Sequence, residues 1–254
     1  MNIYALQLDI VWENKHANHV KVRALLESTS PSRGSLVVLP EMFATGFSMN
    51  VATVTDSLTR ETQEFLAATA SHYGIYLLGG LVTGGPAGRG RNEAVVYSPQ
   101  GVEVARYQKM QPFTLGGESI NYAAGDSPII FPWEGFTVAP LICYDLRFPE
   151  HFRSAVRLGA NLYCVIACWP IMREHHWVTL LQARAIENQA YVVGVNRCGN
   201  DPTFAYPGRS MIIGPHGQIL SDAGRHEGVI SAKPDLNSVQ EWRKVFPALA
   251  DMRP

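Results

Sequence analysis

The stretch "GFTVAPLICYDLRFPE" at residues 135–150 contains, in order, an apolar run, a cysteine, a polar cluster and a proline. The apolar run predicts a buried strand, and we expect a helix from about Pro149 to Leu158. A strand followed closely by a helix is the unit of layered α/β folds, which bind ligands at the carboxyl ends of their strands. Cys143 therefore lies where such a protein places its chemistry.

The same alternation of strands and helices extends over the whole chain. Apolar positions at helical spacing predict three further helices, at about 13–29, 59–73 and 173–189. Shorter apolar or alternating runs predict strands at 3–10, 35–41, 74–82, 92–109 (with a turn at 98–101), 160–169, 190–196, 210–220 (with a turn at 214–217) and 227–233. Since no repeat or low-complexity linker interrupts this pattern, we expect one α/β domain over residues 1–254, with one sheet or two.

Composition excludes several classes of protein. The 254 residues include 21 basic and 22 acidic side chains, a balance that indicates neither a nucleic-acid nor a membrane-surface partner. No apolar run approaches the roughly 20 residues that cross a bilayer, and the first residues lack the pattern of a secretion signal. The four cysteines have irregular spacing, which favours a reducing cytoplasm over a disulfide framework.

Two charged residues end strands in the same way as Cys143. Glu41 closes "VVLPE" and Lys109 closes "VEVARYQK". Each residue alone has a commoner explanation, because lone cysteines are usually small core residues and lone charges are usually solvated. Together they supply a nucleophile, a base and a cation at sheet edges, which predicts a catalytic site. We also expect the nearby helix N-terminus to favour the thiolate of Cys143.

Three segments resemble, in their order and spacing, the signature segments of the nitrilase superfamily of carbon–nitrogen hydrolases. They are "LPEMFATGFSMN" (39–50), "YQKMQPF" (107–113) and "LICYDLRFPE" (141–150). The stretches at 169–197 and 246–252 are similar to the omega-amidase-like branch of that family. The resemblance implies a four-layer αββα sandwich, a homodimer, and catalysis without a metal or an organic cofactor.

The resemblance also implies a role for each site residue. Glu41 is the general base, Lys109 the cation and Cys143 the nucleophile that forms a thioester with an amide substrate. Glu118, in "LGGESINY", matches a second glutamate that positions Lys109 or the substrate amide. We expect the oxyanion to be held by Lys109 and by the backbone N–H of Tyr144.

Omega-amidases that resemble this chain take short dicarboxylate monoamides such as 2-oxoglutaramate and succinamate. A site for these substrates must hold the distal carboxylate, and a forked arginine is the natural partner. Arg173 is our candidate and Arg147 the competing one. Trp169, Phe43 and Phe113 are the expected walls of the site.

Three departures from the usual pattern of this branch leave the substrate open: Ala44 replaces a serine, Gln111 a histidine and Cys168 an asparagine. Alternative substrates are an N-carbamoyl compound, an amide of the deaminated-glutathione type or a nitrile. In another class, the chain would be a non-catalytic binding or scaffold protein on the same fold. A cysteine-based dehydrogenase is disfavoured, because no dinucleotide fingerprint follows the first strand.

Other conspicuous residues have simpler explanations. The neighbouring His175 and His176 lack the spacing that places two histidines on one helix face, so they do not predict zinc. Cys164 and Cys168 are expected in the core. The glycine-rich stretch at 84–91 lacks the ending of a phosphate-binding loop and predicts a flexible hairpin.

Overall fold

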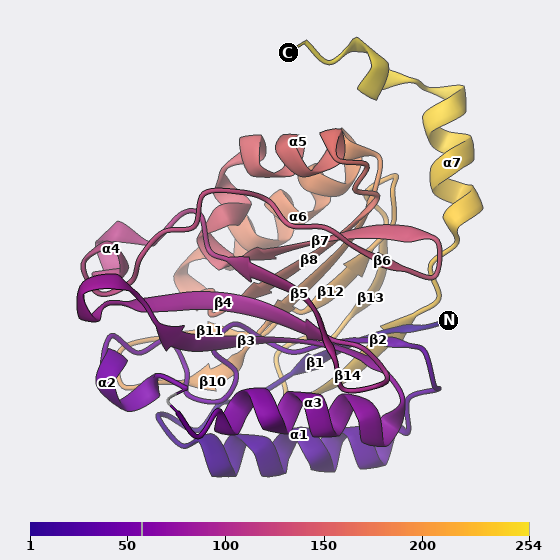
Figure 1. Ribbon diagram of the computed structural model, residues 1–254. Coiled ribbons are helices and arrows are strands. Elements are labelled where there is room, and N and C mark those ends of the chain that lie inside the picture. Colours follow the sequence, from indigo (N-terminus) through magenta and orange to yellow (C-terminus); the bar gives the residue numbers. More distant parts are fainter. Residues whose placement is uncertain (57, 254) are drawn as a thin grey trace.

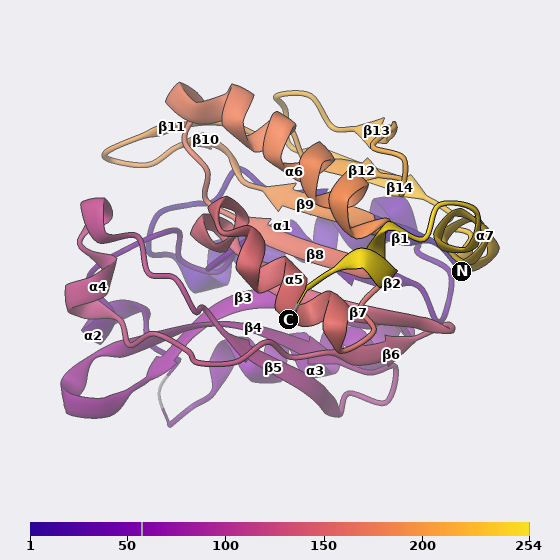
Figure 2. The ribbon, with the colours of Figure 1, turned by 90° about the horizontal axis from the view of Figure 1, so that it is seen from above.

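The computed structural model describes residues 1–56 and 58–253 and confirms the four-layer αββα prediction. Two six-stranded sheets face each other, with α1 and α3 covering one outer face and α5 and α6 covering the other (Figure 1). Figure 2 shows α5 and α6 side by side above the second sheet. The helices are α1 (Lys15–Thr29), α2 (Val51–Val54), α3 (Glu61–Tyr73), α4 (Glu118–Asn121), α5 (Pro149–Arg157), α6 (Glu174–Asn188) and α7 (Leu236–Val245).

Each sheet combines parallel strands at its centre with antiparallel strands at its edges. The first sheet has the spatial order β14 (Gly228–Ala232), β1 (Ile3–Gln7), β2 (Leu36–Val38), β3 (Tyr76–Gly84), β4 (Gly90–Tyr97), β5 (Glu103–Gln108). The second has the order β13 (Ile219–Asp222), β12 (Met211–Ile213), β9 (Tyr191–Asn196), β8 (Leu162–Ala167), β7 (Phe136–Ile142), β6 (Phe131–Trp133). A small hairpin of β10 (Cys198–Asn200) and β11 (Ala205–Pro207) stands apart from both.

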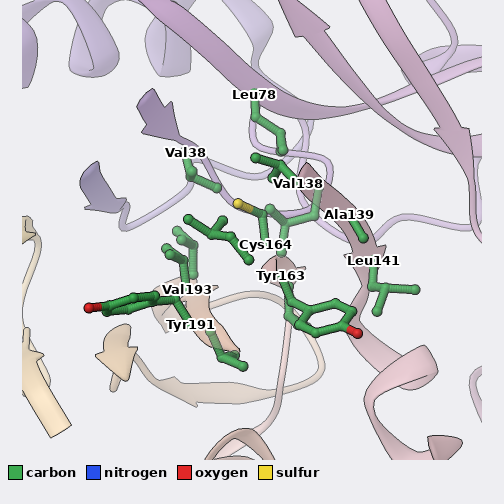
Figure 3. Packing of buried hydrophobic residues seen from close by; sticks show 14 of the residues in the cluster. Val38, Leu78, Val138, Ala139, Leu141, Tyr163, Cys164, Tyr191 and Val193 are labelled. Atoms are coloured by element: carbon green, nitrogen blue, oxygen red, sulfur yellow. The ribbon is translucent and has the colours of Figure 1, made fainter. Parts of the chain in front are cut away.

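Alternation within the strands of the first sheet divides its side chains between two cores. In β2, Leu36 and Val38 face the core between the sheets, whereas Val37 packs outward under α1 and α3. This double burial explains why the run at 35–41 is apolar without interruption. The inner core also contains Cys164, which lies among apolar side chains as predicted (Figure 3).

Several boundaries differ from the sequence prediction. The strand expected at 35–41 ends at Val38, so Glu41 lies in a turn beyond it. The helix expected at 59–73 begins at Glu61. The predictions omitted α7, which is short and capped by the Asp235 side chain accepting from the backbone N–H of Asn237. Nowhere in the described chain does a helix have the length and apolar character needed to cross a bilayer.

Candidate active site

The ends of three strands bring the predicted catalytic side chains to one place. Glu41 follows β2, Lys109 follows β5 directly, and Cys143 follows β7 directly. Lys109 Nζ lies 3.0 Å from Glu41 Oε1, and 2.8 and 3.0 Å from the two carboxylate oxygens of Glu118. The side chains of Glu41 and Glu118 are 0% exposed and that of Lys109 is 2% exposed. The lysine is therefore enclosed between two buried carboxylates.

Asn92, on β4, completes this cluster and was missed in the sequence. Its side-chain Nδ2 donates to Oε1 of Glu41 at 2.7 Å and to Oε1 of Glu118 at 2.9 Å. Backbone N–H groups reach the other two oxygens, from Cys168 to Glu41 Oε2 at 2.8 Å and from Phe113 to Glu118 Oε2 at 2.6 Å. Every carboxylate oxygen thus has a donor, which fixes the orientation of both glutamates.

The charges around Lys109 decide the protonation states of the site. Although burial opposes the ammonium form, the carboxylates of Glu118 and Glu41 raise the pKa of Lys109 well above its usual value. Burial, and then the Glu41 carboxylate, raise the pKa of the Cys143 thiol well above its usual value, and Lys109 offsets this only in part. Cys143 is therefore a thiol at rest, beside a lysine that is charged.

A thiolate at Cys143 was expected from the nearby helix N-terminus, but burial opposes the charged form and raises the pKa of the thiol. Cys143 begins a five-residue 3₁₀ helix, Cys143–Arg147, and α5 begins at Pro149, as predicted. Its φ of 48° lies in the left-handed region, which costs a non-glycine residue free energy and is typical of functional sites. A strained backbone conformation at the nucleophile is also found in the nucleophile elbows of other hydrolases.

A pocket of about 230 Å³ opens at Cys143. Glu41, Lys109 and Glu118 do not line it, so Cys143 is the predicted catalytic residue that meets a ligand there first. The lining residues are Phe47, Phe113, Leu115, Cys143, Tyr144, Arg147, Cys168, Trp169, Pro170, Arg173, Phe204 and Tyr206. The small volume favours a short ligand, and the two arginines in the lining favour one that carries an anionic group.

Phe43 is not a wall of this pocket, contrary to the sequence prediction. It is fully buried in the core beneath α1 and α3, with its ring centroid 6.1 Å from that of Phe65. Phe47, four residues later, lines the pocket and lies with its ring 5.3 Å from Lys109 Nζ. Both residues stand in an irregular segment, where strand alternation does not tell which side chain faces inward.

Cys168 is buried, as predicted, but it has a second property that the prediction did not include. It lines the pocket, and its Sγ donates to the backbone oxygen of Glu41 at 3.4 Å. It stands just beyond the end of β8 at Ala167. The neighbouring Trp169 is held in place by Asn196, whose Oδ1 accepts its backbone N–H at 2.7 Å.

Both candidate arginines reach the pocket. Arg173 lies 5.6 Å from the ring centroid of Phe113, and Arg147 lies 4.7 Å from that of Trp169. Their side-chain hydrogen bonds go to the sulfur of Met172 and to a ring nitrogen of a histidine. Within residues 1–56 and 58–253, neither arginine forms an ion pair with a carboxylate.

The two arginines also influence each other. Burial, and then the neighbouring charge of Arg173, lower the pKa of Arg147 from its usual value. An anion placed between two such cations would gain from both and would relieve their repulsion. By contrast, the described residues hold no group of three or more histidine, cysteine or acidic side chains arranged for a metal ion.

The chain is similar in sequence to known proteins over nearly its whole length. The sequence model of the family described as "Carbon-nitrogen hydrolase" matches residues 3–244. A 2-oxoglutaramate amidase of Bacillus subtilis (strain 168) is 34% identical over 99% of this chain and 97% of its own length. The omega-amidase YafV of Escherichia coli (strain K12) is 36% identical over 99% and 96%.

The chain is also similar to solved structures. A CN-hydrolase superfamily protein of Xanthomonas campestris, solved with an arsenic adduct in its active site, superposes with a TM-score of 0.92 at 31% identity. The match covers 100% of this chain and 97% of that one.

Proposed function

Because this chain belongs to the carbon–nitrogen hydrolase family, we propose that it hydrolyses the terminal amide of short dicarboxylate monoamides. The substrates are of the 2-oxoglutaramate and succinamate type, and the products are a dicarboxylate and ammonia. The names of the relatives in Bacillus subtilis and Escherichia coli support an amidase of this kind.

The observation that carries the substrate class is the pair of arginines at the pocket. Arg147 and Arg173 both line it, and neither has a carboxylate partner within the described chain. Partly buried guanidinium groups without an anion favour a substrate that brings one, and their forked geometry suits a carboxylate. A monoamide of a short dicarboxylic acid would place this carboxylate at the arginines and its amide at Cys143.

The first half of the reaction follows from the protonation states. Since the thiol of Cys143 is protonated at rest, Glu41 removes its proton as the sulfur attacks the amide carbonyl. The developing oxyanion is stabilised by the Lys109 ammonium and by the backbone N–H of Tyr144. Glu41 then donates its proton to the leaving nitrogen, the C–N bond breaks, and ammonia departs from a thioester on Cys143.

Hydrolysis of the thioester reuses the same groups. Glu41 deprotonates a water that attacks the thioester carbonyl, the C–S bond breaks, and the carboxylate product leaves with the thiol restored. Glu118 keeps Lys109 charged and in position throughout, through its contacts at 2.8 and 3.0 Å. Each step uses side chains and backbone groups alone, so the proposal requires no cofactor.

We further propose that residues 1–254 act as one domain in a cytoplasmic homodimer. The family resemblance supports the dimer, and four free cysteines suit a reducing compartment. Exposed apolar side chains on the late helices, such as Ile186 and Val245, are compatible with an interface. Sedimentation analysis tests the assembly, and a monomeric enzyme with full activity would remove that part of the proposal.

The deciding experiment compares succinamate and 2-oxoglutaramate with the neutral methyl ester of succinamate. We expect ammonia release from both acids, with kcat/KM at least about tenfold above that of the ester, and no release by Cys143→Ala. Equal rates for acid and ester would overturn the substrate class but leave the hydrolase. If no amide is cleaved and iodoacetamide labels Cys143 no faster than Cys198, the non-catalytic alternative is favoured.

A further inference from the structure

Asp145 is a buried carboxylate that the proposed mechanism does not use. It is 0% exposed and lies two residues after Cys143. Its Oδ1 accepts the backbone N–H of Gln111 at 2.9 Å. Its Oδ2 accepts the hydroxyl of Tyr107 at 2.7 Å and the backbone N–H of Ile142 at 2.9 Å. No cation within the described chain forms an ion pair with it. Three hydrogen bonds therefore offset part of the cost of its burial.

The partners of Asp145 are arranged around the two catalytic segments. Tyr107 and Gln111 lie two residues before and two residues after Lys109. Ile142 directly precedes Cys143, and Asp145 itself follows it by two residues. One carboxylate therefore ties the end of β5, in the first sheet, to the end of β7, in the second.

We propose that Asp145 is a positioning residue, whose carboxylate fixes the separation between the Lys109 ammonium and the Cys143 sulfur. The inference rests on the proposed function, because that separation matters for a tetrahedral intermediate formed on Cys143. Misplacement of reacting groups by about 1 Å can cost on the order of 100-fold in rate. A carboxylate that holds both segments at once would prevent this.

Asp145 can hold the two catalytic segments in place only while its carboxylate is ionised. If Asp145 is protonated, one of its oxygens becomes a donor, yet two of the groups that face it are backbone N–H donors. Burial raises the pKa of Asp145 to about 7, opposed by the charge of Lys109 and by the hydrogen bond from Tyr107. The pKa values of both Lys109 and Tyr107 are themselves raised, so neither titrates near neutrality. We therefore expect kcat to fall as the pH drops through about 7.

A purely structural role is the alternative, and Asp56 provides the matched control. It is buried, and it accepts the backbone N–H groups of Thr62 and Gln63 at 2.9 and 3.0 Å at the start of α3. It neither lines the pocket nor contacts the catalytic segments. Asp56→Asn thus removes a buried, hydrogen-bonded carboxylate from another part of the protein, where Lys15 also pairs with it at 3.4 Å.

The test compares Asp145→Asn with Asp56→Asn between about pH 5.5 and 8.5, with succinamate as substrate. We expect Asp145→Asn to lower kcat about 100-fold, to change KM by less than about threefold and to lose the fall near pH 7. Asp56→Asn should keep the kcat and pH profile of the wild type. A kcat of Asp145→Asn within about twofold of the wild type, or an equal loss in both variants, would overturn the proposal.

The contributions of Asp145 and Asp56 to folding stability should change with pH in opposite directions. The folded-state pKa of Asp145 is raised, so ionisation in the folded protein disfavours folding and stability from this group is lost as pH rises from about 4 to 7. Burial opposes the carboxylate of Asp56, but its hydrogen bonds win and lower its pKa, so its contribution is lost as pH falls. Urea unfolding should therefore show Asp145→Asn gaining relative stability with rising pH and Asp56→Asn losing it.

Tyr107→Phe keeps the proposal testable if Asp145→Asn does not fold. Removing the hydroxyl removes a hydrogen bond that lowers the pKa of Asp145, so the acid fall of kcat should move to higher pH. An unchanged midpoint would count against Asp145.

If succinamate is not hydrolysed at all, the proposed function fails separately, and alkylation of Cys143 by iodoacetamide replaces turnover as the measured rate. It should be about tenfold slower in Asp145→Asn and unchanged in Asp56→Asn; equal alkylation rates in these variants would overturn the positioning role.

Discussion

We call Lys109, Glu41 and Glu118, which are buried and do not line the pocket, the floor of the site. Arg147 and Arg173, which line the pocket, are its mouth. The two groups differ in how their charges are paired. At the floor, Lys109 contacts the carboxylates of Glu41 and Glu118, and each carboxylate oxygen has a donor. At the mouth, Arg147 and Arg173 have no carboxylate partner in the part of the chain that the structure describes. The difference indicates that the groups for bond breaking are fully organised before a ligand arrives. The groups for recognition are completed by the ligand itself.

The largest effect should come from changing the base at the floor. Glu41→Gln keeps the shape of the side chain but removes its capacity to accept a proton. We expect kcat to fall by about 10³-fold or more, while KM for succinamate changes little because the arginines remain. Steady-state ammonia release measures both constants.

The control for this variant is Glu93→Gln, which changes a buried glutamate paired with Arg106 outside the pocket. It should leave kcat within about twofold of the wild type. A Glu41→Gln enzyme with normal kcat and raised KM would reverse the assignment of floor and mouth.

The second effect concerns stability. Lys109→Met leaves the carboxylates of Glu41 and Glu118 buried without a cation, which should cost about 3–5 kcal/mol of unfolding free energy at neutral pH. The raised pKa of Lys109 keeps its own contribution constant below about pH 10. Below that pH the deficit of the variant therefore reports the loss of the ion pairs and not a change in the ionisation of Lys109.

Urea unfolding at about pH 5 and pH 8 measures this deficit. Lys21→Met, which breaks an ion pair with Glu227 whose two side chains are 31% and 32% exposed, should cost at most about 1 kcal/mol. If Lys109→Met were no more costly than this control, the floor would not be the closely coupled unit that its distances indicate.

The third effect is at the mouth. Arg173→Gln and Arg147→Gln should each lower kcat/KM for succinamate about 10- to 100-fold, mainly through KM, because a charged hydrogen bond to the substrate carboxylate is lost. Hydrolysis of the neutral methyl ester should be nearly unchanged. Arg225→Gln is the control, since Arg225 is an exposed arginine that pairs with Glu174 away from the pocket. Equal losses of kcat/KM for acid and ester would show that the arginines support the structure of the pocket without binding the substrate carboxylate.

Sequence periodicity predicted much of the fold because most strands have both faces covered. Strand–helix alternation placed Glu41, Lys109 and Cys143 at strand ends, and their contacts in space follow from that topology. The choice between one sheet and two was beyond the sequence, because it depends on pairings such as Ile3 with Ala232, far apart in the chain. The local sequence pattern does not reveal which distant strands pair with each other.

The parts of the site that were missed have a common physical cause. Asn92 looks like an ordinary polar residue within a strand, and its two carboxylate partners are 51 and 26 residues away. Phe43, which was wrongly assigned to the wall, and Phe47, which was missed, both stand beyond the end of β2, where alternation no longer predicts which way a side chain points. The orientation of these side chains depends on the backbone conformation of the turns, which the sequence pattern does not predict.

The smallest predicted effect tests the boundary between core and pocket. Phe43→Leu should cost about 1 kcal/mol of stability and leave kcat/KM unchanged, because Phe43 is buried in the core under α1 and α3. Phe47→Leu should leave stability nearly intact but lower kcat/KM about 3- to 10-fold, because its ring lies 5.3 Å from Lys109 Nζ and lines the pocket. Urea unfolding and succinamate kinetics on both variants measure the pair. The reverse pattern, with Phe43 governing KM, would restore the sequence-based wall and move the pocket to the other side of this turn.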